Sequence, residues 1–462
     1  PPAEIEAALL ALQAQGHVLQ GRFTPGPGPT EWCERHLLAR IHRYTLRRLR
    51  REIEPVEPRD FARFLFDWQH VGPSTRVSGP DALSAVLGQL EGFEAPAALW
   101  EAELLPARVG DYASGWLDEL CTAGRVLWTR LRPNAMEARG GGSLSLRATP
   151  ILLLPRRHAA LWSALAPAPA QDEHLGSRAR RVVQFLATAG ASFFDEIADA
   201  TRLLQSELED ALSELVARGR ANCDSYAGLR ALLVPAAKRS SAHAGRRRRV
   251  PLSGIADAGR WSLTRVVASA DPHDEAGAPA QSASASASPS ASASASVEQV
   301  ARILLRRYGV MCWSLREREA GWLPPWPDLV RTYRRLEARG EIRGGRFIAG
   351  LSGEQFALPE AIALMRQVRR QPPDGTLVCL SASDPANLLG SIVAGARVPR
   401  VPGARVLYRD GVPIATSIAG QVELLEPVGA QQQNAVMQAL SRASMGQQQP
   451  AAESAAANME SS

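Results

Sequence analysis

A twelve-residue segment near the start of the chain recurs much later in the sequence. LQAQGHVLQGRF at Leu12–Phe23 returns as LEARGEIRGGRF at Leu336–Phe347, with seven of twelve positions identical or nearly so. Shorter copies follow at Leu120–Gly124 and Leu215–Gly219, each with leucine four residues before glycine. This spacing predicts that the leucine is the last buried residue of a helix, that the glycine ends the helix in a left-handed conformation, and that a short strand follows.

A helix that leads into a two-stranded hairpin is the second half of a winged helix. The first half is clearest at 177–235, where one helix is followed by a helix, a turn and a third helix. A similar unit spans 297–358, with prolines before its third helix. The predicted fold class is therefore α+β: a tandem array of winged-helix domains followed by a small β-barrel.

The remaining boundaries follow from shifts in composition. We expect a partial winged-helix unit at 1–30, a helical or winged-helix unit at 31–110 and a further winged-helix unit at 111–165. Residues 236–296 are first basic and then Ser/Ala-rich, and we expect a disordered linker because strict Ser/Ala alternation leaves no apolar stripe to bury. Short β-like runs at 359–429 predict the barrel or a curled sheet. We expect 430–462 to be a disordered tail with at most one short helix.

Composition excludes several classes of function. Arginine supplies nearly all of the positive charge behind the net +6, because Lys238 is the only lysine. A P-loop needs a lysine after glycine to reach the phosphates, and Lys238 follows two alanines, so we expect no ATPase and no cofactor in this chain. The five cysteines are scattered singly and no histidine has zinc-ligand spacing, so we expect no metal.

The sequence also bears on where the protein works. No run of residues reaches the roughly 18 apolar positions that a membrane helix needs, so we expect no membrane partner. Single, scattered cysteines fit a reducing compartment, and we expect a cytoplasmic, nucleoid-associated protein. Because the first residue is Pro1 and helix-like sequence begins at Ile5, we interpret the chain as a piece of a longer polypeptide.

Arginines mark the candidate contacts with nucleic acid. The predicted helix 31–53 places Leu38, Ile41, Thr45, Leu49 and Ile53 on one face and basic residues on the other. The candidates on its basic face are Arg40, Arg43, Arg47 and Arg51. They either contact phosphates or form a solvated surface that is balanced by the acidic residues that follow.

Further arginines lie where a winged helix usually meets a groove. The third helices and their turns offer Arg331, Arg334 and Arg335 in one unit and Arg202 in another. In a tandem array, these side chains could face a neighbouring module instead. The run Arg246, Arg247, Arg248 and Arg249 is either a basic arm for nucleic acid or an inert part of the linker.

Several segments together resemble one family. They are EWCERHLLARIHRYTLRRLRREIEPV, RDFARFLFDWQHV, QLEGFEAPAALWE, LPARV, GRWSL, LEARGEIRGGRF, GEQFALPE and VLYRDG. They resemble the C-terminal region of long bacterial large helicase-related (Lhr) proteins, and the match runs through most of Ala3–Leu425. The resemblance implies a superfamily 2 helicase whose ATPase core precedes this region, uses ATP and Mg²⁺, moves 3′ to 5′ on single-stranded DNA and serves DNA repair.

That resemblance implies partners for this region. They are single-stranded or damaged DNA and the helicase core of the same polypeptide, with an RNA:DNA hybrid and a second copy of the chain as further candidates. The region itself would be an accessory module for nucleic-acid binding and assembly.

Winged helices followed by a β-barrel also resemble a family of DNA glycosylases, which remove damaged or uracil bases. Those enzymes position the attacking water with Gln-x-Gln or Gln-x-Asp, and the nearest element here is Asp67-Trp68-Gln69, which does not meet the motif. Asp67 and Gln69 are the catalytic candidates, as base and water-orienting group in reversed order. The alternative is a polar helix end with a structural role. An open basic cleft around the two residues would favour the glycosylase, and a packed core would favour the structural role.

Overall fold

The structure is a computed structural model of the chain. It describes residues 2–24, 26, 28–51, 53–131, 145–166, 175–234, 255–264, 289–427 and 429–445. The run Arg246–Arg249, most of the expected linker and the end of the expected tail lie outside these residues.

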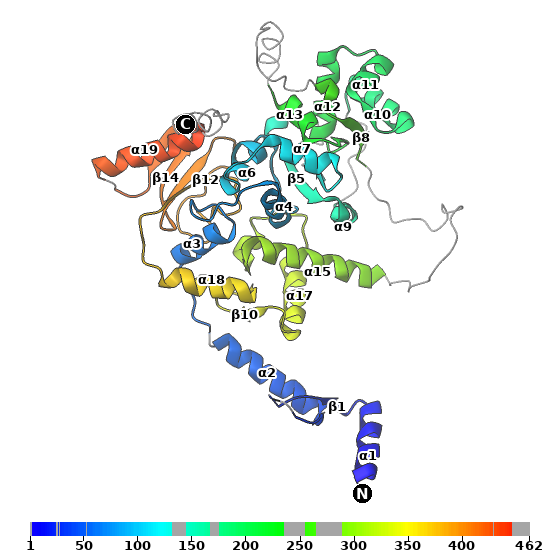
Figure 1. Cartoon of the computed structure of the whole chain (residues 1–462), viewed down its shortest axis with the longest axis vertical. Helices are drawn as coiled ribbons and strands as arrows, with labels where there is room; N and C mark the ends of the chain where they lie inside the picture. Colours follow the sequence, from blue (N-terminus) through cyan, green and yellow to red (C-terminus); the bar gives the residue numbers. More distant parts are fainter. Residues whose placement is uncertain are drawn as a thin grey trace, which may run out of the picture.

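Within the described ranges, three winged-helix units share one topology (Figure 1). The first contains α4 (Pro80–Gln89), β3 (Ala95–Pro96), α5 (Ala97–Leu99), η1 (Trp100–Leu104), α6 (Leu105–Arg108), α7 (Ser114–Thr122), β4 (Val126–Thr129) and β5 (Pro150–Pro155). Its sheet has the order β3-β5-β4, so the last strand lies in the middle. This unit runs across residue 110, where the composition predicts a boundary.

The other two units repeat this strand order. The second contains α10 (Ser177–Ala189), β6 (Ser192–Phe193), α11 (Phe194–Thr201), α12 (Gln205–Ala217), β7 (Ala221–Cys223), α13 (Tyr226–Leu233) and β8 (Arg260–Leu263), with the order β6-β8-β7. The third contains α15 (Pro289–Tyr308), β9 (Val310–Met311), α16 (Trp313–Arg316), α17 (Trp326–Ala338), β10 (Arg343–Gly345) and β11 (Gln355–Ala357), with the order β10-β11-β9. The prediction of α+β winged-helix modules is confirmed.

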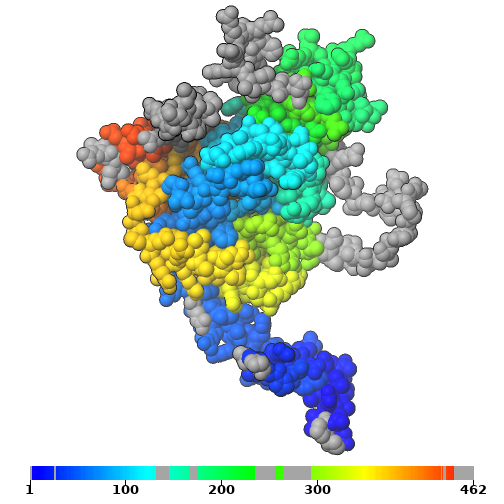
Figure 2. Space-filling model, viewed as in Figure 1, coloured from blue at the N-terminus to red at the C-terminus, as the bar shows by residue number. Residues whose placement is uncertain are grey.

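The N-terminal segment has the elements of a winged helix from its third helix onward. It comprises α1 (Pro2–Ala14) and the antiparallel pair β1 (Val18–Gly21) and β2 (Glu31–Glu34), followed by the long helix α2 (Arg35–Arg51). Figure 2 shows α1, the hairpin and most of α2 standing apart from the rest of the molecule. The C-terminal end of α2 is tied to the third unit by the ion pair between Arg50 and Glu337.

The four sequence repeats end their helices in the same way. The glycines are Gly16, Gly124, Gly219 and Gly340, with φ angles of 74°, 69°, 67° and 79°. The residue after each glycine donates its N–H to the repeat leucine: His17 to Leu12, Arg125 to Leu120, Arg220 to Leu215 and Glu341 to Leu336, at 2.8–3.1 Å. This is the Schellman arrangement, in which the left-handed residue lets two more carbonyls find partners. The predicted left-handed helix ends are confirmed, but the predicted burial of the repeat leucine is wrong for Leu12, which is 39% exposed.

The C-terminal part differs from the prediction, because its sheet is open. Strands β12 (Leu377–Ser381), β13 (Arg405–Arg409), β14 (Val412–Ile418) and β15 (Gln421–Leu424) pair in sequence order, and β15 does not return to β12. The barrel is therefore a wrong prediction. One face packs Tyr408 against Phe66 of α3 (Pro58–Trp68), with ring centroids 5.1 Å apart. The other face packs on α19 (Ala430–Met445), so both apolar faces are covered without closure.

Two helices extend into regions that were expected to lack order. α19 (Ala430–Met445) is longer than the short helix predicted there, and it buries Val436 and Leu440 against Leu407 and Ile414. α15 begins at Pro289, inside the expected linker. The other elements are α9 (Ala159–Leu165), α18 (Pro359–Arg370) and the short helices η2 (Leu146–Ala148), η3 (Arg156–His158) and η5 (Ile255–Asp257).

Each of the two large hydrophobic cores contains residues from more than one unit. The first and second winged-helix units share one core, in which Trp128 and Trp261 meet edge to face at 6.4 Å. The third unit shares a second core with α3, α18 and one face of the C-terminal sheet. The winged-helix units therefore pack against one another through shared cores, and this packing decides which of their faces stay exposed.

Candidate nucleic-acid interface

The predicted arginines of α2 lie on its surface. Arg40, Arg43, Arg47 and Arg51 are exposed, and among the described residues none of them pairs with a carboxylate. Arg40, Arg43 and Arg47 line one surface hollow together with Leu37, Ile41 and Tyr44. Ile41 thus shares the face of the arginines instead of the opposite one, and no residue of α2 is buried. The result is a cationic stripe with apolar and aromatic neighbours, open to solvent.

The arginines of α17 are more restrained. Arg334 pairs with Glu354 at 2.7 Å, and Arg331, which is 75% exposed, pairs with Asp328 one turn away. Arg335 donates to the hydroxyl oxygens of Ser294 and Thr332, each at 3.2 Å. A phosphate would therefore have to compete with existing carboxylate partners at two of these three positions.

The third helices of the other two units are acidic. α12 carries Glu207, Glu209, Asp210 and Glu214 and no basic residue, while α7 carries only Asp118 and Glu119 as charged residues. Carboxylates repel DNA phosphates, so these helices are poorly suited to bind in a DNA groove. Arg202 stands between α11 and α12 in a left-handed conformation with φ 52°, exposed and without a partner among the described residues.

The two catalytic candidates face different surroundings. Gln69 is fully buried, its amide donates to the carbonyl oxygen of Arg307 at 2.8 Å, and its amide oxygen accepts from Arg108 at 2.8 Å. Asp67 is partly exposed and lines a small hollow between α3 and the C-terminal sheet. Asp67 and Gln69 therefore do not share one open cleft, and Gln69 has the packed surroundings of a structural residue.

The Asp67 carboxylate has no hydrogen bond to any described residue. Burial raises the pKa of Asp67, while the charges of Arg63 and His70 act in the opposite direction. A carboxyl with a raised pKa and an open hollow beside it has the chemical features of a general base. Its hollow has a volume of about 110 Å³, which is small for a nucleobase.

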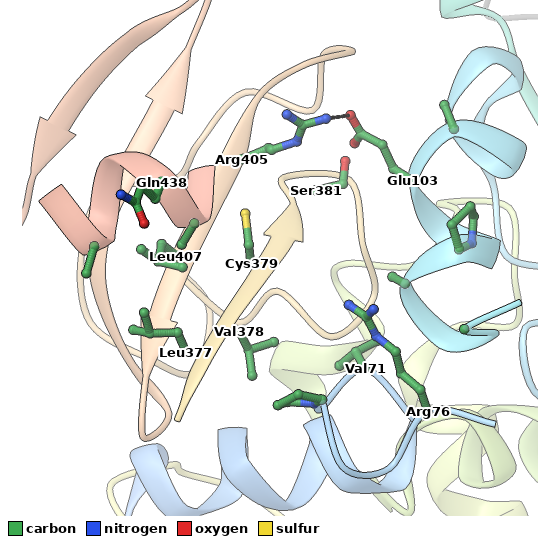
Figure 3. A pocket seen from close by; sticks show the side chains of 17 residues that line it. Val71, Arg76, Glu103, Leu377, Val378, Cys379, Ser381, Arg405, Leu407 and Gln438 are labelled. Atoms are coloured by element: carbon green, nitrogen blue, oxygen red, sulfur yellow. Dashed lines mark hydrogen bonds and ion pairs between the residues drawn. The ribbon is translucent and has the colours of Figure 1, made fainter. Parts of the chain in front are cut away.

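A larger groove adjoins this hollow and shares Pro73 and Val378 with it. The groove has a volume of about 700 Å³ and lies between the first winged-helix unit, β12, β13 and α19 (Figure 3). Arg405 crosses it to meet Glu103 at 2.9 Å, while Arg76 points into it without a partner among the described residues. The groove combines apolar walls with one unpaired cation, which suits binding of an anionic ligand.

Cys379 lines the groove but is a poor nucleophile. Burial raises the pKa of its thiol to about 11, so little thiolate forms near neutral pH. The sequence does not reveal the groove, because its walls come from the first winged-helix unit, the C-terminal sheet and α19, which are far apart along the chain.

Two further features concern metals and membranes. Within the described part of the chain, no group of three or more His, Cys, Asp or Glu residues could hold a metal ion. Among the same residues, no helix combines the length and the apolar character of a membrane-spanning segment.

Comparison with known proteins identifies relatives. Residues 56–155 and 290–377 each match a model described as a winged-helix domain of large helicase-related protein. The chain is 30% identical over 429 residues to the Mycolicibacterium smegmatis protein named Lhr helicase/probable uracil glycosylase, covering 87% of this chain and 26% of the relative. The Escherichia coli Lhr helicase/uracil glycosylase is 29% identical, with 85% and 25% covered.

Among solved structures, the Streptomyces sahachiroi DNA glycosylase AlkZ aligns with 85% of this chain and 97% of its own, at 13% identity and a TM-score of 0.46. The chain spans about a quarter of the length of the two curated relatives. Both winged-helix matches and both relatives agree, and the chain belongs to the large helicase-related family, as a C-terminal portion of a longer Lhr protein.

Proposed function

We propose that this chain is the nucleic-acid-binding and assembly region of an ATP-dependent 3′-to-5′ DNA helicase that acts in DNA repair in the cytoplasm, at the nucleoid. The motor, with its ATP and Mg²⁺, would lie elsewhere in the longer polypeptide, because this chain lacks a P-loop lysine. One observation carries the proposal: Arg40, Arg43 and Arg47 form an exposed stripe on α2 with no carboxylate partner among the described residues.

Unpaired arginines favour a polyanion for electrostatic reasons. Binding of phosphates releases the cations condensed on the nucleic acid, and the affinity then falls with rising salt. Tyr44, which is 68% exposed, lies in the same hollow as the arginines and offers a surface on which an unpaired base can stack. Single-stranded or damaged DNA is therefore the proposed ligand. Binding of an RNA:DNA hybrid should be measured in the same experiment.

The assembly role is supported by the exposed face of α1. Ile5 and Leu12, which precede Gly16 by eleven and four residues, are 63% and 39% exposed. In two of the three other repeats the leucines at the same two positions are fully buried: Leu208 and Leu215 before Gly219, and Leu329 and Leu336 before Gly340. α1 thus exposes the helix face that α12 and α17 bury in the cores of their units. We assign this face to the helicase portion of the same polypeptide.

DNA binding is tested by replacing the α2 stripe. The triple variant R40Q/R43Q/R47Q should bind single-stranded DNA more weakly than the unmodified chain. The slope of log affinity against log salt should fall by about 0.7 for each phosphate that the variant no longer neutralises. The matched control R178Q/R260Q/R369Q removes three exposed arginines that already pair with carboxylates. Equal slopes for the two triple variants, or no binding by the unmodified chain at low salt, would contradict the proposal.

Assembly is tested in the full-length polypeptide. Leu12→Glu should loosen the contact between this region and the helicase portion, measured as faster hydrogen exchange in α1 and easier proteolysis near it. Leu10→Glu is the control, because Leu10 is 50% exposed on the opposite face of the helix. If Leu12→Glu instead changes only the oligomeric state, the face contacts a second copy of the chain and the assignment is wrong.

A second candidate function is supported by Asp67. The names of both curated relatives include uracil glycosylase, and Asp67 has a raised pKa in a hollow that adjoins the larger groove. In this function, Asp67 would activate the water that attacks the sugar carbon of the excised base, and Arg76 would hold a flanking phosphate. Gln69 is not part of this arrangement because both ends of its amide are engaged in the interior.

The second candidate is tested by measuring base release from uracil-containing single-stranded DNA. Asp67→Asn should abolish release while Gln371→Leu, at another residue that lines the same hollow, should leave it largely intact. Absence of release by the unmodified chain would remove this candidate and leave the DNA-binding proposal standing.

A further inference from the structure

Three arginine side chains gather where the loop between β12 and β13 meets the turn after α16. Arg400 donates through both Nη atoms to the carbonyl oxygen of Arg318, at 3.1 Å each. Arg318 itself donates to Ser391 Oγ and to the carbonyl oxygen of Asp384, at 3.2 Å each. Arg397 donates from Nε to the carbonyl oxygen of Gly390 at 2.9 Å. The three side chains are thus held by neutral oxygens of two neighbouring segments.

The acidic groups next to this cluster are already neutralised. Asp384 is 1% exposed and forms a bidentate pair with Arg108. Glu319, also 1% exposed, pairs with Arg307 and accepts from the Tyr308 hydroxyl at 2.7 Å. Within the described part of the chain, no carboxylate pairs with Arg318, Arg397 or Arg400. The cluster therefore carries three positive charges, none of them in a direct ion pair, and Glu319 acts on Arg400 only at longer range.

The surroundings of the cluster disfavour the charged form of Arg400. Burial lowers the pKa of Arg400, and the charges of Arg318 and Arg397 lower it further, while Tyr308 and Glu319 act in the opposite direction. The Nε atom of Arg318 is buried and has no hydrogen-bond partner among the described residues. Arg397 and Arg400 nevertheless remain exposed, so that their other N–H groups can reach a ligand.

The chemistry of the cluster selects phosphate. A guanidinium presents two parallel N–H donors that match two oxygens of a phosphate, and charge-assisted bonds of this kind are the strongest available at a surface. Anchoring by backbone carbonyls reduces the conformational entropy that binding would otherwise remove. Because the cluster lies on an extended loop and not on a recognition helix, it suits contact with a backbone and not reading of base edges.

We propose that Arg318, Arg397 and Arg400 form a binding site for the phosphodiester backbone of a nucleic-acid strand, separate from the stripe on α2. The inference rests on the proposed DNA-binding function and specifies a second surface that performs it. Two basic surfaces far apart in the sequence would let one strand be held at two points, which strengthens binding through a raised effective concentration.

The test uses the double variant R397Q/R400Q and a labelled oligo-dT strand titrated across a series of salt concentrations. The slope of log affinity against log salt should fall by about 1.4, because each phosphate neutralised on a single strand contributes about 0.7. R178Q/R369Q is the control of equal charge change, since both of those arginines are paired with carboxylates. R397K/R400K keeps the charges and should retain most of the slope.

The outcomes separate this inference from the proposed function. A slope that falls in R397Q/R400Q but not in R178Q/R369Q, with unchanged melting temperatures, supports the site. Equal slopes in these two variants overturn it, even while R40Q/R43Q/R47Q still weakens binding and the proposed function stands. Inorganic phosphate at equal ionic strength should compete only weakly; competition as strong as that of unlabelled oligo-dT would mark a free-phosphate site and overturn the assignment to a strand.

Discussion

Arg108 and Asp384 lie 276 residues apart and form a bidentate ion pair in the interior, with N–O distances of 2.8 and 2.9 Å and exposed fractions of 0% and 1%. The pair joins α6 of the first winged-helix unit to the loop after β12. Through Gln69 and the carbonyl oxygen of Arg307, it is also linked to α3 and α15. One buried polar network therefore holds together parts that the sequence separates widely.

Breaking this pair should strongly destabilise the chain. Asp384→Asn leaves the Arg108 guanidinium buried without its counter-charge, and we expect the free energy of unfolding to fall by about 3–5 kcal/mol. Urea unfolding followed by tryptophan fluorescence measures the change. Glu207→Gln breaks the pair with the half-exposed Arg178 and should cost below about 1 kcal/mol. Similar losses in the two variants would show that the buried pair contributes no more than a surface one.

Gln69 should behave as a structural residue. Gln69→Met keeps the volume but removes both hydrogen bonds, which leaves the carbonyl oxygen of Arg307 without this donor. We expect a loss of about 1–3 kcal/mol in the free energy of unfolding. Gln184→Met, at an exposed position of α10, should change it little. Wild-type stability in Gln69→Met together with a loss of uracil release would point instead to a catalytic role.

The pH dependence of stability should report on Asp67. Its pKa is raised in the folded state, so the folded chain holds a proton that the unfolded chain has already released. The free energy of unfolding should therefore fall as pH rises from the unfolded pKa, about 3.9, through the folded pKa. Asp67→Asn removes this titration, so its stability relative to the unmodified chain should rise over that window. A relative stability that is constant between pH 4 and 7 would contradict the raised pKa.

The repeat glycines should differ in how they tolerate alanine. At Gly340 a Cβ atom would meet nothing within 4 Å, so Gly340→Ala should cost only the left-handed strain of about 1–2 kcal/mol. At Gly219 the same atom would lie 2.5 Å from the carbonyl oxygen of Arg130, and the loss should be larger. Gly321→Ala has open space and no positive φ and is the control. Thermal melting of the three variants ranks the costs, and an equal loss at Gly219 and Gly340 would refute the close contact.

The helix ends and the modules could be predicted because their causes are local. A left-handed glycine and a leucine four residues earlier suffice to form the same hydrogen bonds at Gly16, Gly124, Gly219 and Gly340, whatever surrounds them. The absence of a P-loop lysine likewise needs no fold to be seen. The sequence by itself therefore determined the winged-helix repeats and predicts that this chain has no motor of the P-loop type.

Only the tertiary structure decided which polar groups are free to act. Asp67 and Gln69 are two residues apart, yet one lies beside a hollow and the other bonds to Arg108 and to the backbone of α15. Arg397 and Arg400 lack any periodic pattern and become a cluster only where Arg318 meets them. The sheet stays open because α19 covers its outer face. Such outcomes depend on burial and charge partners supplied by distant segments, and short-range patterns do not encode them.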